Sequence, residues 1–278
     1  MARIDSLSIL LDPSGQDKLK EEYGKVIANI EKSTISAQLK NTDLSGDPTA
    51  GSVEAKRFAN TTSNVYGTAR TGGAGQKLKA NPVVVTIDTD KELINEVEEK
   101  DVKLYGVDGL IEKKSAMDEK SMKRELERAF FTEAIAAGTA VTLTATVINE
   151  QAEELIQKIE TVKNDYVDGV DRDMISITCD TVTYGKLRNF LDTKMNSNVD
   201  TAANEFGMFH GVRIYSSVYL PAKSEMIAMV DGSIAQPVMT TLDEAGKIEL
   251  SNAYHFGMFY SYGTKAVMPD LIFKVVGA

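Results

Sequence analysis

The sequence predicts an α+β fold, and three observations carry that prediction. Val83, Val85 and Ile87 alternate with their neighbours in residues 79–89, which indicates a strand that pairs with 56–70 around a glycine-rich tip. Residues 109–137 repeat apolar side chains every three to four positions, which indicates one long helix. From residue 174 onward, short apolar runs alternate with turns, which indicates a compact sheet with a helix.

The composition bounds the classes of function. The chain has 278 residues, enough for one large domain or two modest ones, and 42% are hydrophobic. A net charge of −10 lacks the basic footprint that binding phosphates requires, so it argues against direct nucleic-acid recognition. No stretch reaches the roughly 18 apolar residues of a membrane span. A single cysteine, Cys179, excludes an intrachain disulfide and a four-cysteine zinc site.

The N-terminal segment predicts a detachable helical arm. Residues 16–32 have helical spacing, and a polar, turn-rich stretch follows at 41–52. Such a helix on a polar linker usually packs elsewhere, so we expect its apolar face to contact another subunit. We also expect that deleting residues 1–45 leaves a core that folds but assembles poorly. The predicted contact residues of the arm are Leu19, Tyr23 and Ile27.

The hairpin predicts a second contact. It has few large apolar residues and no core of its own, so it is stable only when it lies on something else. Glycines at its tip tolerate positive φ, and its basic residues suit an acidic surface on a neighbour. A phosphate-binding loop is the alternative, but the GxxxxGK[ST] pattern is absent. The predicted contact residues are Arg70, Gly72, Gly73, Gly75, Lys77 and Lys79.

The long helix is the most clearly predicted element. Asp108 suits its N-cap, Gly138 suits the position after its end, and an apolar row runs along one face. The row is Met122, Leu126, Phe130 and Ala134. Its first half has no wide apolar face, so we expect that half to be exposed or at an interface. Residues 90–101 fit a helix or a continued strand, and we favour the strand.

The second half predicts alternating short elements. We expect helices at 150–165 and at 181–191, the latter capped by Asp180, and Cys179 in the core after a strand. A glycine-punctuated loop covers 196–211, and a turn lies near 231–233. The predicted strands are 141–147, 174–178, 212–218, 226–230, 247–250, 266–268 and 271–276.

The titratable residues do not form a recognisable catalytic site. His210 and His255 lie among aromatic residues and glycines, with no nucleophile at a known spacing, so we expect packed or turn histidines. Asp165, Asp168, Asp171 and Asp173 crowd one loop, but without the spacing of a calcium site. The acidic run from Glu92 to Asp101 predicts a solvated or interface face. We therefore expect no catalytic residues, no cofactor and no metal.

The order of these parts resembles a tailed-phage major capsid protein of the Hong Kong ninety-seven fold. The segments FHGVRIYSSVYLP at 209–221 and AMVDGSIAQ at 228–236 are similar to strands and turns of that family. The resemblance implies an N-terminal arm (1–52), an extended E-loop hairpin (53–90), a peripheral P domain (91–172, with spine helix 109–137), an axial A domain (173–245) and strands returning to the P domain (246–278).

The resemblance also implies a function that is structural rather than enzymatic. Hexamers and pentamers of the chain would tile an icosahedral virion shell around double-stranded DNA, assembled in the bacterial cytoplasm without a membrane. Scaffolding, portal and decoration proteins are the partners it implies. The alternatives are an encapsulin-type nanocompartment, another virion subunit such as a tail tube, and an unrecognised enzyme.

Overall fold

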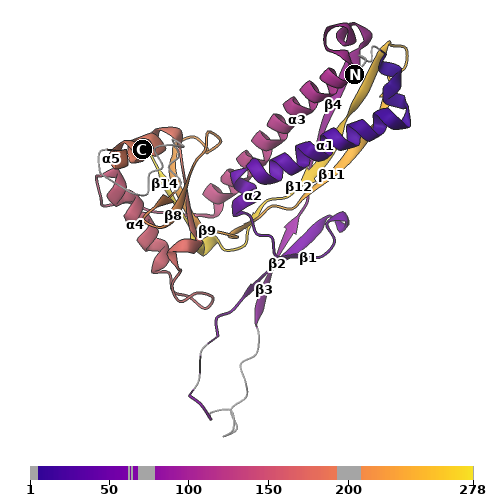
Figure 1. Ribbon diagram of the computed structural model, residues 1–278. Helices are drawn as coiled ribbons and strands as arrows, with labels where there is room; N and C mark the ends of the chain where they lie inside the picture. Colours follow the sequence, from indigo (N-terminus) through magenta and orange to yellow (C-terminus); the bar gives the residue numbers. More distant parts are fainter. Residues whose placement is uncertain (1–5, 62, 64, 68–78, 193–207, 278) are drawn as a thin grey trace.

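The computed structural model describes residues 6–61, 63, 65–67, 79–192 and 208–277, without the side chains of 191 and 192. Figure 1 shows three parts: an elongated limb built around a long helix, a compact α/β unit beside its lower end, and a hairpin that projects away from both. The predicted α+β class is confirmed, because helices and four separate sheets make up these parts.

The limb is a three-stranded antiparallel sheet with helices on one face. Its strand order is β11 (Val238–Lys247), β12 (Ala253–Tyr262) and β4 (Thr89–Glu98). Helices α1 (Pro13–Ser33) and α3 (Glu99–Ala137) pack against it. The sequence pattern predicts no strand at 253–262, yet β12 is the central strand of the sheet. Its inward residues join the helices in one core: Tyr254, Phe256, Met258, Tyr260 and Tyr262.

Helix α3 starts earlier than predicted and is interrupted. The favoured strand at 90–101 is correct up to Glu98, but it belongs to a new strand, β4, in a different sheet from β3. A capping box between Glu98 and Asp101 opens the helix. Gly106 then breaks the helical path, with φ 72° and ψ 168°. The predicted start at residue 109 lies just beyond this break. The predicted apolar row from Met122 to Ala134 is buried along its whole length.

The end of α3 lies where predicted, but for a different reason. Gly138 is extended, with φ −71°, so it does not need the left-handed region that usually selects glycine there. A Cβ at this position would lie 2.6 Å from the carbonyl oxygen of Ala134 and 2.8 Å from Cγ2 of Ile272. Glycine is therefore required by the close approach of the helix end to strand β14 (Ile272–Val276).

The N-terminal arm packs on its own chain, which corrects the expectation of a detachable arm. It comprises η1 (Leu7–Leu11), α1 and α2 (Ile35–Leu39). α1 lies along α3, so the first half of α3 is covered rather than exposed. The apolar face of α1 is satisfied within the chain because α3 and β11 supply a matching apolar surface. The buried apolar side chains of the arm are Leu7, Leu10, Leu19, Tyr23, Val26, Ile30 and Leu39.

Two buried carboxylates of α3 tie the arm to the limb. Asp118 accepts hydrogen bonds from the Tyr23 hydroxyl at 2.7 Å and from the Asn95 side-chain amide at 2.6 Å, which joins α1, α3 and β4. Glu127 accepts from the backbone N–H of Ile35, at the start of α2. Burial raises the pKa of both carboxyls, only partly opposed by these hydrogen bonds.

The α/β unit is a six-stranded mixed sheet between helices. The order is β5 (Thr139–Ala140), β14, β9 (Ser224–Val230), β6 (Ile175–Cys179), β8 (Val212–Ser216) and β7 (Met208–Phe209). Alternate residues of β9 face opposite ways: Ala228 packs toward α4 (Ile148–Glu160) and α5 (Thr181–Asp192), whereas Ile227 and Met229 pack toward α3. The sheet is thus covered on both faces.

Several predictions for this unit are confirmed and one is wrong. Asp180 accepts from the Thr183 N–H at 2.9 Å and caps α5, and Cys179 is buried as the last residue of β6. The predicted strand at 141–147 is not formed: β5 ends at Ala140, and the N–H groups of Thr144 and Ala145 donate to the Glu154 carboxylate instead of to a neighbouring strand. The core clusters also cross the predicted domain limits. α4, assigned to the P domain, packs on this sheet, whereas β11, assigned largely to the A domain, belongs to the limb.

The hairpin rises from β2 (Ser52–Phe58) and β3 (Ala80–Thr86), which pair antiparallel from Ser52↔Thr86 to Phe58↔Ala80. The pairing with 79–89 is confirmed, but the first strand lies earlier than the predicted 56–70. We call residues 52–86 the hairpin arm. The remaining short elements are β1 (Leu44–Ser45), η2 (Pro48–Ala50), η4 (Arg172–Met174), β10 (Ile234–Ala235), β13 (Lys265–Ala266) and η5 (Pro269–Leu271).

Candidate assembly surfaces

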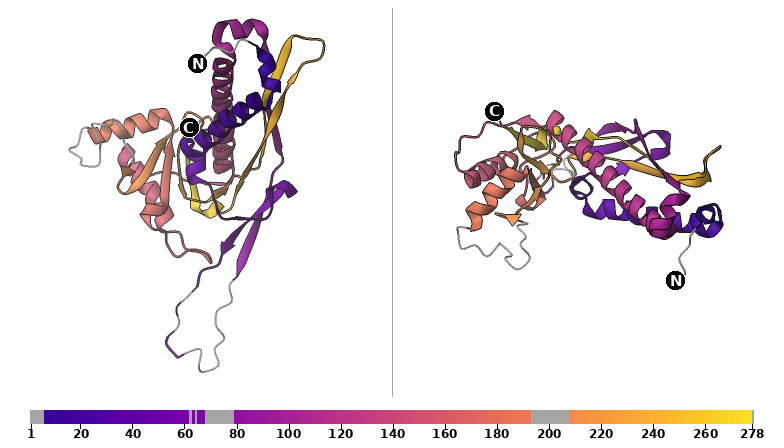
Figure 2. Two further views of the ribbon diagram at one scale, coloured as in Figure 1. Left: turned by 45° about the vertical axis from the view of Figure 1, so that its right-hand side comes forward. Right: turned by 90° about the horizontal axis from the view of Figure 1, so that it is seen from above.

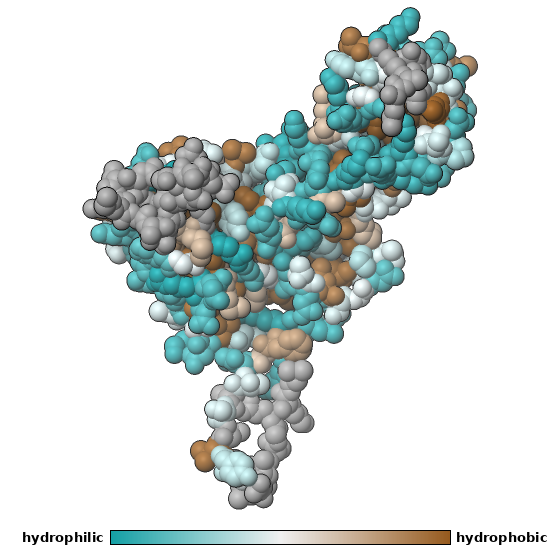
Figure 3. All heavy atoms as spheres, in the orientation of Figure 1, coloured by the Kyte–Doolittle hydropathy of each residue, from teal (hydrophilic) through white to brown (hydrophobic). Residues whose placement is uncertain are grey.

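The hairpin arm extends beyond the body of the chain. A small apolar cluster of Val53, Ala55 and Val85 with Ala235 and Val267 packs under its base. Further out, Val65 and Tyr66 are 84% and 85% exposed. In Figure 3 the described atoms of the arm, which are the coloured ones, extend below the compact surface. A two-stranded ribbon is at best marginally stable alone, so an arm this exposed needs another surface.

The hairpin arm differs in charge from the rest of the chain. No Asp or Glu occurs from Ala59 to Ile87, whereas Arg70, Lys77 and Lys79 do. This stretch therefore carries +3, and the remainder carries −13, since −10 − 3 = −13. Opposite charges on two parts of one chain favour contact between one part and the other part of a second copy.

A matching acidic surface lies on the limb. Residues of β4, β11 and β12 that alternate with the core positions point away from α1 and α3, and we call this side the open sheet face. The view from above in Figure 2 shows both helices on the other side of the sheet. The face includes Glu92, Ile94, Glu96, Thr241, Asp243, His255 and Phe259.

The register of the strands groups apolar and acidic side chains on this face. Phe259 pairs with Glu92, and His255 pairs with Glu96. Ile94 and Phe259 are 40% and 41% exposed, so an apolar centre is rimmed by carboxylates. An apolar centre with a charged rim is the usual build of a protein contact surface. Phe259 is not among the predicted contact residues, although the aromatic alternation of 254–262 is a signal for a strand that would expose it.

A third exposed feature lies at the distal tip of the limb. Leu250, between β11 and β12, is 109% exposed and has a positive φ of 59°. The turn around it is ordered by hydrogen bonds from Ile248 N to Ala253 O (2.9 Å) and from Ser251 N to Ile248 O (3.2 Å). Left-handed backbone costs an L-residue about 1–2 kcal/mol. Leucine therefore stabilises neither the turn nor the core of this chain.

We expect Leu250→Asn to raise the melting temperature of the isolated chain by about 2 °C. Asparagine tolerates the left-handed region, so the gain should approach 1 kcal/mol. Scanning calorimetry measures it, with Ser251→Asn as the neighbouring control. Self-association should weaken in the same variant. A lower melting temperature would mean that Leu250 packs within its own chain.

The predicted contact residues divide into four groups. Leu19 and Tyr23 are buried in the chain's own core, so their side chains are not available to a neighbour in this conformation. Ile27 is partly buried against that core. Lys79 is exposed beside β3, and its carbonyl oxygen accepts from Ala59 N at 2.9 Å. Arg70, Gly72, Gly73, Gly75 and Lys77 lie outside the described residues.

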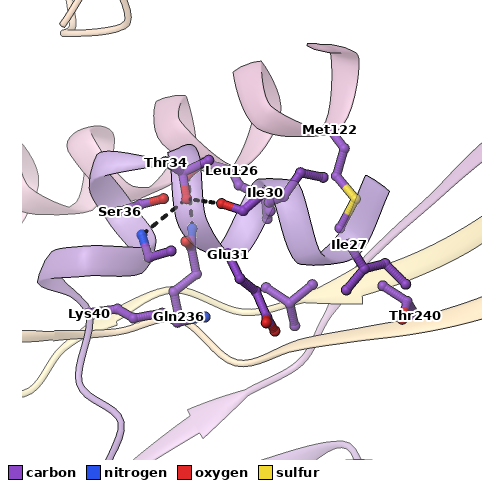
Figure 4. Close-up of a pocket in the computed structure, with 12 residues that line it drawn as sticks. Ile27, Ile30, Glu31, Thr34, Ser36, Lys40, Met122, Leu126, Gln236 and Thr240 are labelled. Carbon is purple, nitrogen blue, oxygen red and sulfur yellow. Dashed lines mark hydrogen bonds between the residues drawn. The ribbon is translucent and has the colours of Figure 1, made fainter. Parts of the chain in front are cut away.

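A small pocket lies between α1, α2, α3 and β11 (Figure 4). Its volume is about 130 Å³, and Ile27, Ile30, Met122 and Leu126 form its apolar wall. Thr34 closes one end by donating to Ile30 O at 2.7 Å. Substrate pockets are usually about 300–1,000 Å³. Neither histidine nor Cys179 lines it, so it offers poor material for catalysis.

The histidines and the acidic loop have structural partners. His210 contacts Glu153 at 2.8 Å, and Arg172 bridges Glu153 and Glu160. The Arg172 guanidinium lowers the pKa of Glu153 to about 2, so this carboxyl is a charged partner rather than a proton donor. Asp168 pairs with Lys163. Among the described residues, no cluster of three His, Cys, Asp or Glu could hold a metal ion.

None of the helices in the described part of the chain is long and apolar enough to cross a membrane. No protein-family model matches the sequence, and no curated protein is similar to it. Solved structures are similar in fold. A protein of Mycobacterium phage Che8 is 18% identical, covering 87% of this chain and 91% of that one, with a TM-score of 0.64.

Two further structures extend the likeness. The capsid of cyanophage P-SCSP1u is 12% identical, with 88% of each chain covered and a TM-score of 0.65. A virus-like particle from Pyrococcus furiosus is also 12% identical, with 94% and 96% covered and a TM-score of 0.56. Identities this low establish the fold and nothing finer. The chain therefore has the Hong Kong ninety-seven fold of phage capsid proteins, as the order of its parts indicated.

Proposed function

We propose that this chain is a major capsid protein that assembles as hexamers and pentamers into an icosahedral phage head around double-stranded DNA. The observation that carries the proposal is an exposed basic hairpin arm together with an acidic open sheet face on one chain of capsid fold. Its location would be the virion, after assembly in the host bacterial cytoplasm. Its partners would be copies of itself, with scaffolding, portal and decoration proteins.

In this proposal the hairpin arm of one copy lies across the open sheet face of the next. The two surfaces are different, so the contact is heterologous, and a heterologous contact that closes on itself forms rings. The arm would cover Ile94 and Phe259, which are otherwise half-exposed, while Arg70, Lys77 and Lys79 meet Glu92 and Glu96. Burial of the apolar centre provides affinity, and the charges select the partner.

The proposal also accounts for the net charge. Packaged DNA must leave the shell freely, and a chain of net charge −10 does not bind it tightly. Hence we propose that the shell encloses DNA without recognising its sequence.

We expect the triple substitution Arg70→Glu, Lys77→Glu and Lys79→Glu to raise the protein concentration needed for assembly at least about tenfold, which corresponds to 1.4 kcal/mol. The melting temperature of the isolated chain should not change, because the apolar residues at the base of the arm, Val53, Ala55 and Val85, are left unchanged. Size-exclusion chromatography with light scattering measures the assembly, and negative-stain microscopy identifies its form.

The matched rescue is Glu92→Lys with Glu96→Lys, which reverses the charge of the open sheet face. The two substitutions alone should also weaken assembly, and their combination with the reversed arm should restore it. Closed shells at unchanged concentration from the reversed arm alone would contradict this contact. A control at Lys56→Glu, on strand β2 at the base of the arm, tests for a general charge effect.

The second candidate is an encapsulin-type compartment, favoured by the likeness to the Pyrococcus furiosus virus-like particle over 94% of this chain. Particle contents distinguish the two. An absorbance ratio at 260 and 280 nm typical of nucleic acid supports the phage head, whereas a co-purifying enzyme supports the compartment. A tail-tube subunit would instead give open helical stacks.

A further inference from the structure

We propose that a polar clamp at the base of the hairpin arm, formed by Arg57, Asp270, Asn164, Asp165 and Tyr166, sets the direction in which the arm leaves the body. Arg57, near the end of β2, donates from Nη1 and Nη2 to the two carboxylate oxygens of Asp270 at 2.5 and 2.8 Å. This two-point fork fixes orientation as well as distance.

The same carboxylate and guanidinium have further partners. The Asn164 side-chain amide donates to Asp270 Oδ2 at 2.5 Å, and the Arg57 guanidinium lies over the Tyr166 ring at 4.4 Å. Asn60 N–H donates to the Asp165 carbonyl oxygen at 2.9 Å, one step further along the arm. Asp270 on η5 and the Tyr166 ring on the loop therefore hold Arg57 near the end of β2, the Asp165 carbonyl oxygen holds the residue just beyond the strand, and Asn164 holds Asp270 in place.

The clamp is attached to rigid parts of the body. Asp270 lies in η5, directly before β14, an inner strand of the six-stranded sheet. The loop that carries Asn164 continues from α4 and is closed by Gly169 N to Val162 O at 2.9 Å. Asn164 Oδ1 accepts from Tyr166 N and Val167 N, which shapes the loop tip. A movement of the arm would have to disturb these elements.

A small rotation at the clamp displaces the far end of the arm by several ångströms. Residues 60–67 can extend about 25 Å beyond it, at roughly 3.3 Å per residue. A change of about 10° at the base would then displace the end by about 4 Å, more than a hydrogen bond or an apolar contact tolerates. The apolar cluster below the base is small and non-directional, so it cannot supply this restraint alone.

Burial acts to raise the pKa of Asp270, but Arg57 and Asn164 lower it on balance, so the carboxylate stays charged near neutral pH. The Arg57 side chain is largely buried. Lysine at position 57 would keep the charge, yet lose the planar fork and the ring contact. This difference separates a directional clamp from a simple charge attraction.

Spin-label distances on the full chain test the clamp directly. Labels at Thr61→Cys and Lys120→Cys report the arm relative to α3, since both sites are exposed. The native Cys179 is buried, which raises its thiol pKa to about 12, so it resists labelling. We expect the distance distribution to broaden at least about twofold in Arg57→Lys, Arg57→Gln and Asp270→Asn, with melting temperatures within a few degrees of the parent.

Lys56→Gln is the matched control, because Lys56 is the adjacent basic residue and points to the other face of β2. Its distribution should equal that of the parent. The clamp would be overturned if all variants gave the same distance distribution as the parent, whether that shared distribution is narrow or broad. If Arg57→Lys keeps the narrow distance distribution of the parent, the clamp acts through charge and not through the direction of the guanidinium fork.

The use of the arm in assembly rests on the proposed function, but the distance measurement does not. If the parent chain never assembles while the distributions behave as expected, the proposed function fails and the clamp stands. If the parent assembles, Arg57→Gln should require a concentration about tenfold higher.

Discussion

Phe130→Asp should prevent folding altogether. Phe130 is 0% exposed and meets Phe131 edge-to-face at 5.5 Å between ring centroids. It belongs to the cluster that joins α3 to the six-stranded sheet through Ile227 and Ile272. Loss of the ring costs about 3–5 kcal/mol, and an unpaired buried carboxylate adds several more. The sum approaches the whole stability of a domain, about 5–15 kcal/mol.

The measurement is cooperative thermal unfolding by circular dichroism after purification. Thr132→Asp, two residues away and exposed, introduces the same charge without entering the core and should fold normally. Phe130→Leu should fold with reduced stability. A soluble Phe130→Asp protein that melts cooperatively would contradict the role of this cluster.

Deleting residues 1–45 should also abolish folding, contrary to the expectation from sequence of a core that survives. The deletion removes seven large buried side chains between Leu7 and Leu39. Each contributes about 1.5–3 kcal/mol by burial, so together they contribute about 10–20 kcal/mol, as much as or more than the whole stability of a domain, about 5–15 kcal/mol. It would also leave Asp118 and Glu127 without their partners on the arm.

A deletion in the hairpin arm is the matched control. Replacing residues 62–77 by an Asn-Gly turn leaves the apolar cluster at the base of the arm unchanged, so the melting temperature should stay the same, and under the proposed function assembly should be lost. Adding a synthetic peptide of residues 1–45 to the truncated chain should restore a cooperative transition. If the chain without residues 1–45 melts within a few degrees of the full chain, the N-terminal arm is not needed for folding.

Local patterns predicted which residues are buried better than what buries them. The row on α3 was correct because four residues spaced by four define one face of a helix. The apolar face of α1 is equally clear in the sequence, yet the pattern does not tell whether the surface that covers this face belongs to the same chain or to another. The structure places α3 there, and only long-range packing could decide it.

The central strand of the limb was missed for a related reason. Gly257 and His255 suggest a turn, although their neighbours alternate as in a strand. In the structure, glycine is needed because the Leu93 carbonyl oxygen lies 2.0 Å from where a Cβ would be. That oxygen belongs to β4, more than 150 residues earlier in the chain. The open sheet face depends on this pairing and therefore could not be assembled from local signals.

The position of the last strands affects how the chain is made. β12 is the middle strand of the limb sheet, and β14 lies between β5 and β9 in the other sheet. Both sheets therefore stay incomplete until residues 253–276 have been synthesised. Pairing over such sequence separations is slow to form and cannot begin on a nascent chain that still lacks those strands. A chain that ends before residue 253 would lose the limb sheet, because β4 and β11 pair only through β12, and the other sheet would lose β14 and β5. Under the proposed function, the strand order would thus keep such incomplete chains out of the shell.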